Sequence, residues 1–234
     1  MLEDLGRKFA RFTTNQVVRR PWAWPLLRRL TRAQFNRMAP AWDQRRSEEA
    51  FAPIEVALDS LDLAPARVLD LGTGTGRAAF LLARRYPEAE VVGADLAADM
   101  LAQARRLTPP ELAGRVRFEE ADAEKLPYAD GSFELVSLAN MIPFFDELAR
   151  VTAQDGAVVF SFSAGPETPI YVPPELLKSQ LATRGFTRET VVRVQRMLFA
   201  AEYKRRQAPP GVKITRKSFG RDRRYPLTNA FRET

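Results

Sequence analysis

From Arg67 onward, short apolar runs alternate with amphipathic stretches, and this alternation restricts the fold more than any other feature of the chain. Five apolar runs have the length of strands and lie at Arg67–Leu71, Val91–Asp95, Val116–Glu119, Phe133–Ala139 and Ala157–Ser163. Three stretches between them have helical spacing and lie at Arg77–Arg85, Ala98–Leu107 and Phe144–Val151. Strands that alternate with helices in this way are typical of a parallel sheet covered by helices. We therefore expect an α/β fold with a mostly parallel sheet.

The part of the chain after Ser163 adds a helix and two more strand-like runs. A helix is predicted at Pro174–Arg184, where Gly185 ends it. The strand-like runs lie at Thr190–Val194 and Met197–Tyr203, and only two residues separate them. So short a connection predicts a hairpin. We expect an antiparallel strand from this hairpin at the sheet edge, and a sheet of seven strands in total.

Residues 1–60 have apolar residues at helical spacing, and two prolines divide this part into separate helices. Within it, the stretch 17–30 places Trp22 and Trp24 among four arginines. A helix of that composition either rests on a membrane surface or packs its Trp and Leu face on the rest of the protein. The sequence leaves both interpretations open.

Charge is distributed unevenly along the chain, whose net charge is +7. Residues 61–165 carry −6, from ten basic and sixteen acidic residues, whereas residues 166–234 carry +9. Much of this positive excess lies in the last thirty residues, which are either a solvated tail or an electrostatic contact for RNA, anionic lipid or a partner. We accordingly divide the chain into an N-terminal helical cap (1–60), one α/β domain (61–206) and a basic, flexible tail (207–234).

The chain has no cysteine and no histidine, which removes several kinds of site. Without Cys there is no disulfide framework and no thiolate ligand or nucleophile. Without His there is no Ser-His-Asp triad and no His-ligated metal, so we expect no metal site. The sequence also shows no apolar run of eighteen residues and no signal-peptide pattern, and we therefore expect a soluble, cytoplasmic protein.

A glycine-rich turn follows the first predicted strand and precedes a helix, in the sequence Asp70-Leu71-Gly72-Thr73-Gly74-Thr75-Gly76-Arg77. Such a turn lets a ligand approach backbone N–H groups at the start of a helix. A dinucleotide fingerprint requires glycine at position 77, where this chain has Arg, and no phosphate-binding Gly-Lys-Ser/Thr is present. Asp70 would repel a pyrophosphate but suits a ligand with positive charge. These features disfavour an NAD-linked oxidoreductase.

Two further acids follow predicted strands. Asp95 closes the second strand, 19 residues after Gly76, which is where α/β nucleotide sites bind ribose hydroxyls. Asp122 follows the third strand in the sequence Glu-Ala-Asp-Ala. Asp95 could equally cap the next helix, and Asp122 could be an ordinary loop acid.

Four stretches of this sequence resemble the class I S-adenosylmethionine (SAM)-dependent methyltransferases, in particular the small-molecule group that includes quinone-biosynthesis C-methyltransferases. They are VLDLGTGTGR (68–77), VVGADLAADMLAQAR (91–105), FEEADAEKLPYADGSFELV (118–136) and FDELARVTAQDGAVVFSF (145–162). The resemblance covers about residues 35–204. It implies a Rossmann-like fold, SAM as cofactor and S-adenosylhomocysteine as product.

The resemblance also assigns residues to the cofactor. The glycine turn would hold the methionine part, Asp95 the ribose, and Asp122 the adenine amino group, while Met100 would either pack on adenine or fill the core. The full set of implied cofactor-binding residues is Asp70, Gly72, Thr73, Gly74, Gly76, Asp95, Leu96, Met100, Asp122, Ala123 and Asn140. The stretch 35–43 resembles the helical cover that lies over the cofactor in this family.

The catalytic group stays unassigned. Many relatives have His after the fourth strand, where this chain has Asn140-Met141-Ile142-Pro143. The acceptor is therefore either already nucleophilic or deprotonated by a carboxylate. Residues expected to line its pocket are mostly apolar or aromatic: Trp42, Asn140, Met141, Ile142, Phe145 and Tyr171.

Such a pocket favours methyl transfer to an O or C atom of a hydrophobic or aromatic small molecule. Two alternatives stay open, an RNA methyltransferase that uses the basic termini and a SAM-binding scaffold without turnover. Contact with a membrane surface is possible in either enzyme, and the sequence does not indicate an oligomeric state.

Overall fold

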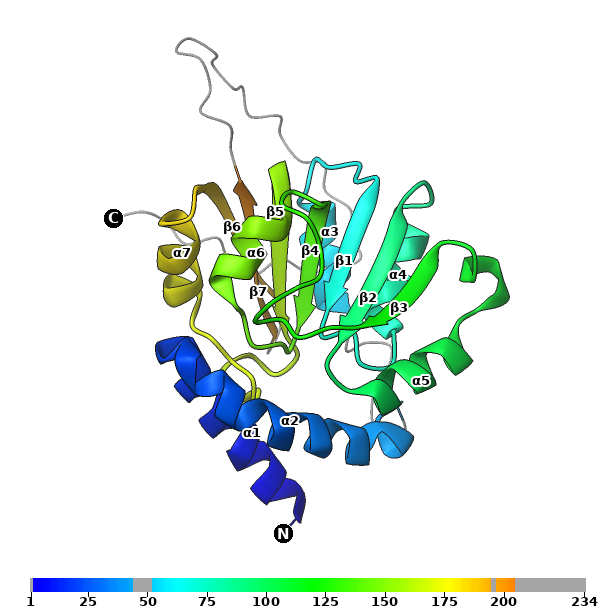
Figure 1. The fold of residues 1–234 in the computed structure, drawn as a ribbon. Helices are drawn as coiled ribbons and strands as arrows, with labels where there is room; N and C mark the ends of the chain where they lie inside the picture. The colour runs from blue at the N-terminus through cyan, green and yellow to red at the C-terminus, as the bar shows by residue number, and fades with distance from the viewer. Residues whose placement is uncertain (1, 44–51, 195–196, 205–234) are drawn as a thin grey trace.

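The computed structural model describes residues 2–43, 52–194 and 197–204. Its centre is a sheet with five parallel strands in the order β3-β2-β1-β4-β5 (Figure 1). These strands are β1 (Arg67–Leu71), β2 (Glu90–Asp95), β3 (Val116–Glu120), β4 (Phe133–Ala139) and β5 (Thr152–Phe162). The predicted parallel α/β fold is confirmed. The strand order reverses between β1 and β4, and in such sheets ligands bind outside the carboxyl ends of the strands at that point.

Helices cover both faces of this sheet (Figure 1). They are α3 (Ala52–Asp59), α4 (Arg77–Arg85), α5 (Ala98–Leu107), α6 (Phe145–Val151) and α7 (Pro174–Ala182), with short 3-10 turns η5 (Pro110–Leu112) and η6 (Gly165–Glu167). Neighbouring residues of β1 point to opposite faces: Val68 packs in a core cluster with residues of α3 and α4, and Leu69 packs in the cluster that includes residues of α6 and α7. Because both faces are buried, the strands are almost continuously apolar.

The fifth strand begins earlier than its apolar run predicts. It starts at Thr152 rather than Ala157, because a change of register against β4 lets the polar residues before Gly156 join the strand. Asp155 has φ +63°, and a Cβ on Gly156 would lie 2.8 Å from the carbonyl oxygen of Glu134. This irregularity depends on the neighbouring strand, so local sequence does not predict it.

The N-terminal part is helical, as predicted. It consists of α1 (Leu2–Arg19), η1 (Pro21–Ala23), α2 (Trp24–Met38) and η2 (Ala39–Ala41). Pro21 lies in the first turn of η1 and Pro25 in that of α2, where a missing N–H costs no helical hydrogen bond. Figure 1 shows α1 and α2 together at one end of the molecule, below the sheet.

The two tryptophans of this part have opposite environments. Trp24 is 2% exposed and packs edge-on against Phe144, whereas Trp22 is 69% exposed. Leu26 and Leu30 are exposed as well. The interpretation that this segment packs its Trp and Leu face on the body is therefore correct for Trp24 and for Leu27, which packs against the core, and wrong for Trp22, Leu26 and Leu30.

After α7 the chain continues as β6 (Phe186–Val194) and β7 (Met197–Lys204), whose residues pair antiparallel to each other, and β7 pairs antiparallel to β5. The basic tail predicted at 207–234 lies outside the described residues. Among the described residues, no helix is both long and apolar enough to cross a membrane.

Candidate functional site

The glycine turn between β1 and α4 requires glycine at three positions. Gly72, Gly74 and Gly76 have φ angles of +74°, +56° and +84°, which side-chain-bearing residues rarely adopt. A Cβ on Gly72 would lie 2.7 Å from the sulfur of Met141, and one on Gly76 would lie 2.7 Å from the ring of Phe118. Gly76 also donates its N–H to the Thr73 carbonyl, 3.0 Å away. Gly76 therefore serves turn geometry and core packing, whereas Gly72 forms a face that Met141 covers.

Asp70 lies under this turn and is 1% exposed. The Thr73 hydroxyl donates to its Oδ2 at 2.6 Å, while Oδ1 has no hydrogen-bond partner among the described residues. Burial is the main reason why the pKa of Asp70 lies at about 7 rather than 3.8; the bond from Thr73 lowers it, and the charge of Asp95 raises it. A buried carboxyl oxygen without a partner can accept a proton or a cationic ligand.

Asp95, at the end of β2, holds the turn in place. Its Oδ2 accepts the N–H of Gly74 at 2.9 Å, and its Oδ1 accepts the N–H of Ala97 at 2.9 Å. Burial raises the pKa of this carboxyl, and the two backbone bonds oppose that shift. A carboxylate has about four acceptor positions, so two stay available for ligand hydroxyls.

Asp122 contacts the N-terminal helices. The Trp24 indole N–H donates to Oδ1 at 2.7 Å, Arg28 donates to Oδ2 at 3.2 Å, and the Glu124 N–H donates to Oδ1 at 3.0 Å. Sequence reasoning did not find the first two partners, because each lies more than ninety residues away along the chain. The only signal was a tryptophan among arginines in an amphipathic helix.

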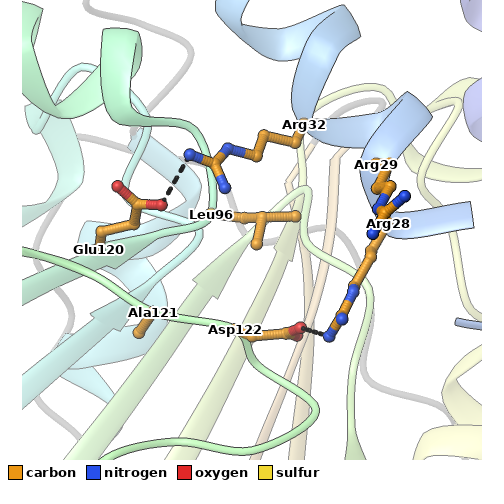
Figure 2. Close-up of a pocket in the computed structure, with 7 residues that line it drawn as sticks. All are labelled: Arg28, Arg29, Arg32, Leu96, Glu120, Ala121 and Asp122. Carbon is orange, nitrogen blue, oxygen red and sulfur yellow. Dashed lines mark hydrogen bonds and ion pairs between the residues drawn. The ribbon is translucent and has the colours of Figure 1, made fainter. Parts of the chain in front are cut away.

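A cavity of about 330 Å³ lies between α2 and the carboxyl ends of β2 and β3. Figure 2 shows three arginines of α2 on one side, and four residues at or just after the ends of β2 and β3 on the other. Its lining residues are Arg28, Arg29, Arg32, Leu96, Glu120, Ala121 and Asp122. Arg32 pairs with Glu120 at 3.0 Å. The cavity thus brings together Leu96 and Asp122, two of the predicted cofactor residues.

Two other predicted residues are buried away from that cavity. Met100 is 1% exposed and packs with Ala39, Ala97 and the partly buried Trp42. Ala123 is 3% exposed. In the described structure Met100 therefore fills the space between α5 and η2, the second of its two predicted roles.

The stretch predicted to cover the cofactor lies against the glycine turn. A Cβ on Gly74 would be 3.5 Å from the Trp42 indole nitrogen. Next to it, Asp43 accepts hydrogen bonds from the Thr75 hydroxyl and the Arg77 Nε, each at 2.9 Å. The sequence does not predict these two contacts of Asp43. Its one signal is Arg77, which stands where the dinucleotide fingerprint has a glycine.

The residues predicted for the acceptor side separate into two groups. Asn140 has φ +53°, and its Oδ1 accepts the Ser163 N–H at 2.9 Å, so it joins the ends of β4 and β5. Met141 and Trp42 lie against Gly72 and Gly74.

The other predicted pocket residues lie deeper in the fold. Ile142 and Phe145 are 4% and 8% exposed, and both belong to the core. Tyr171 is half-buried and packs edge-on against Phe162, with ring centroids 5.2 Å apart. Among the described residues, no three His, Cys, Asp or Glu side chains are placed to hold a metal ion.

Comparison with known proteins points to the same kind of site, one that binds SAM. Residues 68–156 match a family model described as a methyltransferase domain. Over 147 residues the chain is 48% identical to a demethylmenaquinone methyltransferase of Thermus thermophilus. This aligned region covers 57% of this chain and 66% of that protein. Residues 68–156 are therefore a methyltransferase domain.

A second curated relative and a solved structure show how much of each protein the similarity covers. A malonyl-[acyl-carrier protein] O-methyltransferase of Halorhodospira halophila is 44% identical over 154 residues, covering 60% of this chain and 50% of that protein. The chain thus spans between half and two thirds of these relatives. The solved structure of a SAM-dependent methyltransferase from Aquifex aeolicus has a TM-score of 0.61 and 19% identity over 72% of this chain and 98% of that one, which supports the fold.

Class I methyltransferases use SAM, and residues of this chain fit that cofactor. SAM has a positively charged sulfur and an ammonium group, and the partnerless Oδ1 of buried Asp70 is a suitable acceptor for positive charge. Gly72 and Gly74 leave backbone accessible where a side chain would intrude. Asp95 keeps acceptor positions for hydroxyl groups.

Proposed function

We propose that this chain transfers a methyl group from SAM to an O or C atom of a hydrophobic or aromatic small molecule. The observation that carries the proposal is the pair of acids, buried Asp70 and half-buried Asp95, that lies beneath and beside the glycine turn. A pyrophosphate would be repelled by such a pair, whereas a cationic donor is attracted to it. The match of residues 68–156 to a methyltransferase domain supports the same conclusion.

Within this proposal, the cofactor lies along the carboxyl ends of β1 to β3. Gly72, Thr73 and Gly74 contact its methionine part with Asp70 below them, and Asp95 accepts the ribose hydroxyls. Leu96 and Asp122 bind the adenine end, for which the cavity beside α2 provides space. Asp122 has three donors already and therefore keeps about one acceptor position for the adenine amino group.

SAM supplies an activated methyl group, so this chain's residues mainly have to align the acceptor with it. Alignment of reactants can contribute about 7–11 kcal/mol. Trp42 and Met141 cover the turn and exclude water from it, and with Asn140 and Tyr171 they form the side of the site that we assign to the acceptor. Their apolar and aromatic surfaces suit a hydrophobic acceptor.

The acceptor is either already nucleophilic or loses its proton to a carboxylate, because the chain has no histidine. The pH dependence of turnover distinguishes these two cases. A rate that stays constant from about pH 6 to 9 supports the first, and a single inflection near pH 5–6 supports the second.

We also propose the larger organisation of the protein. Residues 1–60 form a helical cap, residues 61–206 the methyltransferase domain, and residues 207–234 a basic tail. The hairpin of β6 and β7 completes a seven-stranded sheet with an antiparallel strand beside β5. The cysteine-free composition is compatible with a cytoplasmic enzyme.

The proposal is tested by following a labelled methyl group from SAM to a panel of acceptors. The panel contains aromatic hydroquinones and phenols, malonyl thioesters and RNA, which represent C, O and nucleic-acid acceptors. We expect label in an organic-extractable small molecule. Binding of SAM without transfer to any acceptor would indicate a scaffold, and transfer to RNA alone would contradict the small-molecule assignment.

A further inference from the structure

We propose that the outward face of α1 and α2 docks on the surface of an anionic lipid bilayer. Seven large apolar side chains are exposed among residues 5–43 and 54–187, whose burial the structure describes, and six of them lie in this short N-terminal part. These six, which we call the outward cap face, are Leu5, Phe12, Trp22, Leu26, Leu30 and Met38. Surface leucines scattered singly need no explanation, but such a concentration marks an interaction surface.

The spacing of two of these residues shows why they share a side of α2. Leu26 and Leu30 are four residues apart on this helix, and Trp22 lies four residues before Leu26 in the adjoining turn η1. The opposite side of α2 holds the buried Trp24 and Thr31. The side of α2 with Trp24 packs on the rest of the protein, whereas the side with Leu26 and Leu30 contacts solvent in the described structure.

The same arrangement recurs on α1. Leu5 and Phe12 are 64% and 52% exposed and lie seven residues apart, close to two full turns. Thr13, Thr14 and Val17 on the other side are at most 1% exposed. Figure 1 shows both helices at the same end of the molecule, so these exposed side chains belong to one region of it.

The charge of this segment identifies the partner as anionic. Residues 5–38 contain nine Arg or Lys residues and no Asp or Glu. Some of the arginines are directed inward, as Arg28 and Arg32 are toward Asp122 and Glu120. The side chains of four others are exposed and make no hydrogen bond or ion pair with the described residues: Arg19, Arg20, Arg37 and Arg29, the last of which also lines the cavity.

Exposed leucine and tryptophan among unpaired arginines match the chemistry of a lipid interface, where apolar side chains enter the acyl boundary and cations contact headgroups. A nucleic acid would satisfy the arginines but would leave Leu26, which is 73% exposed, without an apolar environment. The combination therefore favours an anionic bilayer over RNA.

Docking would also serve the proposed methyl transfer, and this consequence rests on the proposed function. The α2 helix contacts Asp122 and lines the cavity at the carboxyl ends of the strands. A bilayer against its outward side would lie next to the site, so a hydrophobic acceptor dissolved in lipid could enter without crossing water.

The test is sedimentation of the full-length chain with vesicles of phosphatidylglycerol, compared with phosphatidylcholine. We expect binding to the anionic vesicles that weakens with salt. Leu26→Ser with Leu30→Ser should weaken it by about tenfold for each leucine, and Arg19→Gln with Arg20→Gln by about thirtyfold in total. Leu107→Ser is the matched control, because Leu107 is an exposed large apolar residue outside the cap.

Several outcomes would overturn the proposal. One is equal binding to anionic vesicles by the wild type and both double variants, which would assign the lipid contact to the basic tail. Another is binding to RNA but not to vesicles. Self-association that Leu26→Ser with Leu30→Ser abolishes, without vesicle binding, would identify a second copy of the chain as the partner. Calorimetry of SAM binding to the same variants separates this proposal from the proposed function, since neither double variant should change SAM affinity.

Discussion

Similar residues have opposite degrees of solvent exposure in the sheet and in the N-terminal cap. In the sheet, apolar side chains such as Leu69 and Val136 are fully buried, Asp70 is buried as well, and half-buried Asp95 is hydrogen-bonded to the glycine turn. In the cap, leucines and Trp22 are left exposed beside unpaired arginines. Folding of this chain alone explains the residues of the sheet. It explains only the inward side of the cap, which indicates that the outward side is adapted to something outside the fold.

The largest expected effect contrasts a buried leucine with an exposed one. Leu69→Ala should lower the free energy of unfolding by about 2–5 kcal/mol, because it leaves a cavity in the core. Leu30→Ala on the cap should change it by less than about 0.5 kcal/mol. Urea unfolding of both variants measures the difference, and similar losses would mean that the cap face is packed in the folded protein.

The buried acid of the sheet should make stability depend on pH. The pKa of Asp70 is raised to about 7 in the folded protein, so its stabilising contribution is fully present below about pH 4 and is lost as the pH rises to about 7. Each unit of pKa difference corresponds to about 1.4 kcal/mol. Asp70→Asn should remove this slope and be more stable than wild type at pH 8. Unfolding measured from pH 4 to 8 checks this, and parallel curves would contradict it.

Within the glycine turn, two alanine substitutions should separate packing from backbone strain. Gly76→Ala combines positive φ with collision against Phe118 and should cost about 2–4 kcal/mol of stability. Gly74→Ala has similar strain, but its Cβ would make only an ordinary contact with Trp42 at 3.5 Å, so it should cost about 1 kcal/mol. Thermal unfolding measures both. Equal costs would show that packing around Gly76 relaxes.

The smallest effect concerns how the cap is attached. Trp24→Phe removes the hydrogen bond to Asp122 and should cost about 1–2 kcal/mol. Trp22→Phe is the matched control and should leave stability unchanged, because Trp22 is exposed. Denaturant unfolding of both variants measures this difference. A Trp24→Phe protein with the stability of wild type would show that the hydrogen bond to Asp122 does not hold the cap in place.

Local pattern predicted the parallel part of the fold well. The bounds of β1, α4, α5 and β4 agree with the prediction, because periodicity and glycine breaks are local signals. The start of β5 and the bond between Trp24 and Asp122 were not predictable, since each depends on a segment distant in sequence. The glycine turn was predicted with its acids, but not the clamp that Asp43 forms with Arg77.

The central claim is that the acids at the ends of β1 and β2 form a site for SAM, and calorimetry tests it most directly. The full-length chain should bind SAM, and Asp95→Ala should weaken binding by about 1.5–3 kcal/mol, or roughly 10–150-fold. Asp99→Ala is the control, because Asp99 is exposed in the first turn of α5, and it should bind SAM as wild type does. Absence of affinity for both SAM and S-adenosylhomocysteine, or unchanged affinity in Asp95→Ala, would contradict the claim.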